Sequence, residues 1–136
     1  MGIKVKIFID YDSRGLFGHE EPIFINCESF DDFLKKLVEV WRNNKCKYSN
    51  EDTDQFILSV IIDETKNFDL GTFEYNDQNK DYPYNFDFDV YGLSSTINSL
   101  GLGEIDLKKI QLESQADPEF DTMKALIEHL IKLENK

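Results

Sequence analysis

Apolar residues recur at two different periods along this chain, and the combination limits the folds that it can adopt. Over residues 3–9 they alternate with lysines, as in a strand with one buried face. Over residues 30–41 they recur in steps of three and four, as along one side of a helix. A chain that combines both periods is predicted to fold with helices packed on a sheet.

Further segments repeat these two patterns. We predict strands over residues 3–9, 22–26, 56–62, 70–76 and 86–91, the last with Asp87, Asp89 and Tyr91 turned to solvent. Ser29 is a favourable N-cap for a helix over residues 30–43, and Asp117 followed by Pro118 begins a helix that runs to about residue 134. A shorter helix is expected within residues 105–113.

The order of these segments predicts an α+β fold. Because only one long helix interrupts the strands, strand and helix do not alternate as they do in a doubly wound fold. We expect a single domain over residues 1–136, with a mixed or largely antiparallel sheet of about five strands. Two main helices and one short helix are expected to pack on this sheet.

The net charge of −12 is concentrated in the central third of the chain. Residues 51–91 hold eleven acidic and two basic side chains, a balance of −9. Eight of the aromatic residues lie between residues 68 and 91. The chain is too acidic for direct nucleic-acid binding through a basic face, and it is unsuited to an anionic membrane surface.

This acidic, aromatic segment predicts a surface for a basic protein partner. Carboxylates on one sheet face speed association with a positive cleft, and tyrosines supply large contacts. The alternative is a solvated sheet face with no partner. The candidate binding residues are Asp69, Glu74, Tyr75, Asp77, Asp81, Tyr82, Tyr84, Asp87, Asp89 and Tyr91.

A small, acidic, single-domain chain with clustered carboxylates and tyrosines resembles bacterial immunity proteins, of which barstar is the familiar example. The resemblance lies in composition across the whole chain and implies a non-enzymatic inhibitor that covers the basic active-site cleft of a cognate toxin, in many cases a nuclease. Phage proteins that imitate nucleic acid and inhibit a host defence complex have the same composition. No family motif accompanies either resemblance.

A catalytic alternative rests on Asp10 and Asp12, which follow an apolar strand. Phosphatases of the haloacid-dehalogenase type begin this way, with two aspartates beside Mg²⁺, and PIN-like nucleases also place an acid at the end of their first strand. The alternative is therefore a metal-dependent phosphatase or nuclease. Asp63 ends the strand over residues 56–62 and would join the pair if the two strands were parallel neighbours. Ser13 and Arg14 replace the glycine and threonine usual in these phosphatases.

The segment over residues 10–21 also fits part of a calcium-loop pattern. Asp10, Asp12, Gly15 and Glu21 occupy the first, third, sixth and twelfth positions. Arg14 stands where an oxygen ligand belongs, and a strand precedes the loop in place of a helix. We therefore assign no metal, catalytic residue or cofactor to the chain.

The remaining signals predict a cytoplasmic protein. The first residues alternate apolar side chains with lysines and lack the apolar core of a signal peptide. Cys27 and Cys46 form no metal-binding or redox pair, which predicts two reduced thiols. His19 and His129 are too far apart in sequence to suggest a metal site.

Overall fold

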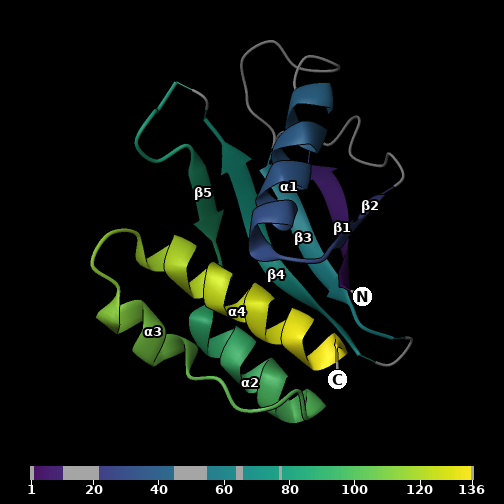
Figure 1. Cartoon of the computed structure of the whole chain (residues 1–136), viewed down its shortest axis with the longest axis vertical. Coiled ribbons are helices and arrows are strands. Elements are labelled where there is room, and N and C mark those ends of the chain that lie inside the picture. The colour runs from purple at the N-terminus through teal and green to yellow at the C-terminus, as the bar shows by residue number, and fades with distance from the viewer. Residues whose placement is uncertain (1, 11–21, 45–54, 64–65, 77, 136) are drawn as a thin grey trace.

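The structure is a computed structural model, which describes residues 2–10, 22–44, 55–63, 66–76 and 78–135. Within these residues the strands are β1 (Ile3–Asp10), β2 (Ile23–Cys27), β3 (Gln55–Ile61), β4 (Asn67–Tyr75) and β5 (Tyr84–Asp87). The helices are α1 (Phe30–Asn44), α2 (Val90–Leu100), α3 (Leu107–Glu113) and α4 (Pro118–Glu134). The strands form one antiparallel sheet in the order β2-β1-β3-β4-β5 (Figure 1). The predicted α+β fold is confirmed.

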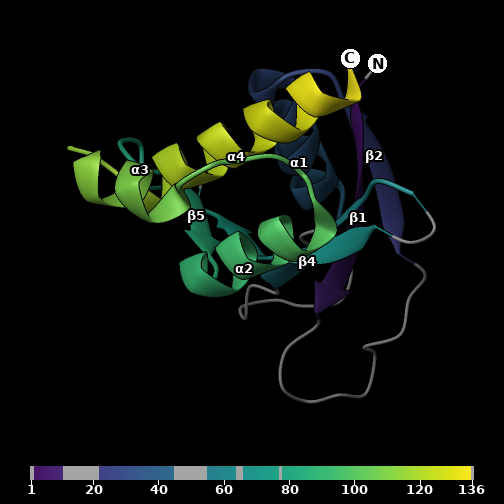
Figure 2. The same ribbon diagram turned by 90° about the horizontal axis from the view of Figure 1, so that it is seen from below.

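The two faces of the sheet have different surroundings. Helices α1 and α4 lie on the same side of the sheet in both views (Figures 1 and 2), and we call this side the covered face. Val5 of β1 is paired with Ile25 on one side and Val60 on the other, and all three are buried on this face. Their neighbours in sequence, including Lys4 and Lys6, lie on the opposite side, which we call the open face.

Aromatic rings fill the space between the covered face and the helices. Phe73 of β4 lies 5.0 Å from Phe86 of β5 and 6.2 Å from Phe56 of β3, measured between ring centroids. Trp41 of α1 packs edge-on against Phe56 at 5.0 Å. Phe120 of α4 lies 6.4 Å from Phe86, so both long helices contact the same group of rings. The helical periodicity seen in the sequence places Trp41 and Phe120 against these strand rings.

A β-bulge keeps β4 in phase with the rest of the sheet. Phe68 and Phe73 are five residues apart, an odd spacing that would put them on opposite faces of a regular strand. The register shifts between Leu58 and Ser59 of β3, opposite Gly71, so Phe68 and Phe73 both face the core. Gly71 has φ of +112°, and a Cβ there would lie 2.3 Å from the Asp87 carbonyl oxygen. Only glycine fits this position without a shift of the backbone.

The strand predicted over residues 86–91 is wrong in its second half. The structure ends β5 at Asp87 and begins α2 at Val90, which adds a helix to the three that were predicted. Asp89 is the N-cap of α2, because its carboxylate accepts a hydrogen bond of 3.1 Å from the Tyr91 amide. Val90, Leu93 and Ile97 form the buried side of α2. Their helical spacing was present in the sequence but overlapped the alternation that precedes it.

Helix α1 begins with a reciprocal capping arrangement. The Ser29 hydroxyl accepts a hydrogen bond of 3.0 Å from the Asp32 amide, and the Asp32 carboxylate accepts one of 3.1 Å from the Glu28 amide. The bond from Glu28, followed by the one from Lys36, lowers the pKa of Asp32 below its ordinary value. Lys36 also donates to the Asn26 carbonyl oxygen of the edge strand β2, which ties the start of α1 to the sheet.

Candidate functional site

The connection between β4 and β5 is held by asparagine side chains. The Asn76 side chain accepts a hydrogen bond of 3.0 Å from the Gln78 amide, and that of Asn79 accepts one of 3.2 Å from the Tyr82 amide. The Asn76 amide donates to the Pro83 carbonyl oxygen at 2.8 Å, which closes the connection. These bonds fix the backbone on which Tyr82 stands. The Tyr82 side chain is 56% exposed, so a partner would meet it already positioned.

Carboxylates surround a hollow at the outer edge of β5. Its volume is about 390 Å³, and it is lined by Thr72, Glu74, Asn85, Phe86, Asp87 and Glu119. Glu74 and Asp87 come from the open face of β4 and β5, whereas Glu119 lies in the first turn of α4. The part of the lining that the structure describes includes these three carboxylates and no basic side chain.

A second hollow, of about 530 Å³, continues from the first along the hairpin. It shares Glu74 and Asn85 with the first and adds Tyr82 and Asp117, the N-cap residue of α4. We call the continuous region the hairpin surface and define it by residues that line the two hollows, Glu74, Tyr82, Asn85, Asp87, Asp117 and Glu119. Asp81 is exposed next to Tyr82 in the same connection. Lys80, in the same connection, is exposed beside it. The surface is acidic, and its chemistry suits guanidinium and ammonium groups.

Asp117 and Glu119 were absent from the sequence prediction of this surface. Both lie more than a full helix away in the sequence, and they reach the hairpin because α4 packs on β5 through Phe120 and Phe86. Asp117 was identified only as a helix start, a role that its hydrogen bond of 3.1 Å from the Phe120 amide confirms. No local pattern in the sequence indicates this tertiary contact.

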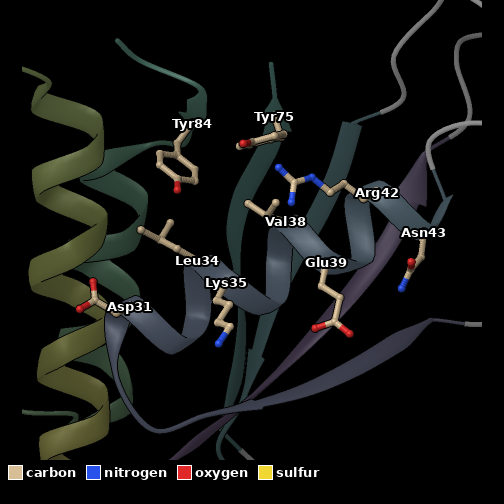
Figure 3. Close-up of a pocket in the computed structure, with 9 residues that line it drawn as sticks. All are labelled: Asp31, Leu34, Lys35, Val38, Glu39, Arg42, Asn43, Tyr75 and Tyr84. Carbon is tan, nitrogen blue, oxygen red and sulfur yellow. The ribbon is translucent and has the colours of Figure 1, made fainter. Parts of the chain in front are cut away.

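Tyr75 and Tyr84 form part of the wall between the hairpin and α1. Their rings lie 5.6 Å apart, and Tyr84 also packs 5.7 Å from Phe120. They border a third hollow of about 580 Å³, where the Arg42 guanidinium lies 5.7 Å from the Tyr75 ring (Figure 3). Both tyrosines are half-buried and packed against the core. Both also line the second hollow, so they stand between the hairpin surface and the core.

The other candidate residues are spread over the molecule. Asp69 is exposed on the open face of β4, where it accepts a hydrogen bond of 2.6 Å from the Ser59 hydroxyl. Asp89 caps α2, and Tyr91 is 67% exposed on that helix with the Lys108 ammonium 5.1 Å from its ring. Asp77 lies outside the described residues. The structure thus places Glu74, Tyr82 and Asp87 along the two adjoining hollows, with Asp81 exposed beside Tyr82, and leaves Asp69, Asp89 and Tyr91 apart from them.

The geometry excludes Asp63 from the catalytic alternative. Strands β1 and β3 are antiparallel, with Asp10 opposite Gln55 and Lys4 opposite Ile61. Asp63 follows Ile61, so it lies at the other end of the strand pair, on the order of 20 Å from Asp10. Its carboxylate accepts a hydrogen bond of 2.9 Å from the Lys66 amide in a turn. Asp12 and the rest of the calcium-like loop lie outside the described residues.

Cys27 and His129 have structural surroundings. Burial raises the pKa of the Cys27 thiol to about 12, with a smaller contribution from Asp32. His129 is half-buried, and its Nε2 lies 2.8 Å from the Leu102 carbonyl oxygen. Among the described residues, no three histidine, cysteine or acidic side chains are grouped so that they would hold a metal ion. Cys46 and His19 are not among those residues.

No protein-family model, curated protein or solved structure matches the chain. The helices that the structure describes are all too short or too polar to cross a membrane.

Proposed function

We propose that this protein is an acidic inhibitor of the immunity-protein kind. Through its hairpin surface it binds the basic active-site cleft of a bacterial toxin, and the favoured toxin is a nuclease. The observation that carries the proposal is the hollow at the β5 edge, which is lined by the three carboxylates of Glu74, Asp87 and Glu119. Such a group of carboxylates is matched by the arginines and lysines of a cleft that binds phosphates.

The residues around this hollow also support the binding of a basic partner. A negative field over one end of the molecule steers a positive partner toward it and raises the association rate. The exposed Tyr82, whose backbone amide donates a hydrogen bond to the Asn79 side chain, offers an aromatic contact of the type that dominates interface energies. The carboxylates and Tyr82 lie on the same surface. A partner attracted by the negative charge would therefore contact the Tyr82 ring.

The probe is the product of the neighbouring open reading frame, which we expect to be a toxin with a basic C-terminal domain. Reversal of two charges, by Asp87→Lys with Glu119→Lys, is expected to slow association roughly tenfold to a hundredfold at low salt. It should also flatten the dependence of the rate on salt, because fewer ionic attractions remain to be screened. Stopped-flow fluorescence over a salt series measures both quantities.

The matched control reverses two exposed acids that line neither hollow of the hairpin surface, Glu104→Lys with Glu128→Lys. It changes the net charge by the same amount, so equal slowing in both variants would contradict the proposal. Tyr82→Ala should raise the dissociation rate at least tenfold, and Tyr91→Ala, which removes the other exposed tyrosine of the described residues, should leave it unchanged.

The alternatives predict other results in the same assays. A nucleic-acid mimic would bind a DNA-binding defence complex in place of a toxin, and would inhibit it in competition with duplex DNA. A metal-dependent hydrolase would release phosphate from a substrate only with Mg²⁺, and would lose this activity in Asp10→Asn.

A further inference from the structure

The open face of the sheet divides its charges between opposite sides. Lys4 and Lys6 stand on β1, and each ammonium lies against an aromatic ring, that of Lys4 4.9 Å from the centroid of Phe24 and that of Lys6 4.5 Å from Phe8. These contacts hold the positive charges close to the sheet. On the other side, Asp69 of β4 presents an exposed carboxylate. The face is therefore positive at β1 and negative at β4.

Apolar side chains accompany these charges. Phe24 is 47% exposed, one of the large hydrophobic side chains of the described residues that remain in solvent. Phe8 is half-buried, and so are Ile57 and Ile61 on the open face of β3. In both views α1 and α4 lie on the other side of the sheet (Figures 1 and 2). The open face thus combines exposed apolar area with charges of both signs.

The strand register places three of these residues in one row. Lys6 is paired with Ser59, and Ser59 is paired with Asp69. The Ser59 hydroxyl donates a hydrogen bond of 2.6 Å to Asp69 and so fixes the carboxylate on its side of the row. Strand β3 is the middle of the five, with β1 and β4 as its two neighbours. Lys6 and Asp69 are therefore placed at equal distances from β3, one on each side.

This arrangement is self-complementary. A two-fold axis that runs parallel to β3 above the open face exchanges the positions of β1 and β4 and leaves the height along the strands unchanged. It places Lys6 of each copy opposite Asp69 of the other, and Ile57 and Ile61 opposite themselves. We propose that the open face is a homodimer interface, in which two copies pack sheet to sheet about this axis.

The dimensions of the sheet set the strength of such a dimer. Five strands about 4.8 Å apart and about six residues deep give on the order of 500 Å² per copy, or about 1,000 Å² in total. This area is at the lower limit of specific interfaces. We therefore expect a dissociation constant on the order of 10–100 μM, at about 0.15 M salt to screen the repulsion between two acidic chains.

The test uses the two charge reversals separately and then together. Lys6→Glu and Asp69→Lys each place like charges opposite one another twice in the dimer, so each variant alone should be monomeric. In a heterodimer of the two variants, both contacts again join opposite charges. An equimolar mixture should therefore dimerise about as well as the wild type, which sedimentation velocity measures over a range of protein concentrations.

The control pair carries the same charge changes on α3, Lys109→Glu and Glu113→Lys, and should dimerise like the wild type whether mixed or separate. A wild-type chain that stays monomeric at several hundred micromolar would overturn the proposal. So would a mixture that behaves like its two separate components. Circular dichroism of each variant establishes that the fold is intact.

A second measurement avoids the charge reversals. Ser59→Cys in a Cys46→Ser background places a thiol beside the two-fold axis, and the buried, neutral Cys27 should not react. A short bis-maleimide should cross-link this variant far faster than Ser95→Cys in the same background, where the thiol is exposed on α2. Equal yields would count against the interface. This proposal does not rest on the inhibitor function, because its test variants change Lys6, Ser59 and Asp69, which lie outside the hairpin surface. Glu74 and Asp87 belong to both surfaces, so a toxin domain is expected to compete with the second copy.

Discussion

The two faces of the sheet are built from the same strands, yet they serve different purposes. On the covered face, Phe56, Phe73 and Phe86 meet the rings of α1 and α4 and exclude water. On the open face, the residues between them in sequence carry the charges of Lys6 and Asp69. Burial of the rings stabilises the fold, whereas the charges contribute little to it in solvent. The difference leaves the open face and the adjoining hairpin able to carry a binding surface without cost to the core.

The largest effect is expected when one ring is removed from each face. Phe73→Ala should lower the free energy of unfolding by about 3–5 kcal/mol, because Phe73 is fully buried and packs against Trp41, Phe56 and Phe86. Phe8→Ala on the open face should cost about 1 kcal/mol, since Phe8 is half-buried and its nearest charged partner is Lys6. Urea unfolding of dilute, monomeric protein measures both.

If Phe73→Ala is too unstable to purify, Phe73→Leu should still lose roughly 1–2 kcal/mol. Equal losses at Phe73 and Phe8 would mean that both faces are packed to the same extent. The conclusion that only the covered face is tightly packed would then be wrong.

A smaller effect is expected at the bulge that keeps the two faces in phase. In Gly71→Ala, the new methyl group would lie 2.3 Å from the Asp87 carbonyl oxygen at a φ of +112°. The backbone of β4 or β5 must move, and we expect a loss of about 2–3 kcal/mol. Gly101→Ala is the control, because Gly101 also has a positive φ, of +67°, but has open space around it. It should cost about 1 kcal/mol.

Unfolding curves of the two glycine variants give the comparison directly. A loss at Gly71 no greater than that at Gly101 would show that the close approach of β4 and β5 is not required. In that case Asp69 and Glu74, which are also five residues apart, would keep their common face for another reason.

Local patterns in the sequence predicted the strands and helices well where the spacing of apolar residues or a capping residue determines the element. The alternation over residues 3–9 gave the buried side of β1, and Asp117 with Pro118 gave the start of α4. The antiparallel pairing that separates Asp10 from Asp63 depends on the order of strands, which no local pattern contains. The same holds for Glu119, which joins the hairpin surface only because α4 packs on β5. Tertiary contacts therefore determine which side chains lie together at the candidate site, and sequence periodicity does not predict them.

Asp89 shows how a correct local pattern led to a wrong element. Phe86 and Phe88 alternate with Asp87 and Asp89, which is typical of a strand, and the alternation continues by chance into a helix start. Aspartate is common both in turns that end strands and at the N-caps of helices. The buried spacing of α2 becomes visible only beyond Val90, where the apolar steps change from two to three and four.

The smallest effect on stability is expected at Asp87 and Asp89, two aspartates that the sequence pattern predicted to have the same exposed position on a strand. Asp89→Ala should cost about 1 kcal/mol in unfolding free energy, because it removes the hydrogen bond to the Tyr91 amide at the start of α2. Asp89→Asn retains an oxygen acceptor and should cost less. Asp87→Ala removes an exposed carboxylate and should change stability by less than about 0.5 kcal/mol.

In the association assay with the toxin domain, we expect the opposite order: replacing Asp87 should have a larger effect on the association rate than replacing Asp89. Asp87 lies on the hairpin surface and its replacement should slow association, whereas Asp89→Asn removes one charge from the start of α2 and should leave the rate nearly unchanged. If Asp89→Asn slowed association as much as Asp87→Ala, the partner would extend past β5 onto α2. The hairpin surface would then have to include Asp89 and Tyr91, as the sequence alone had predicted.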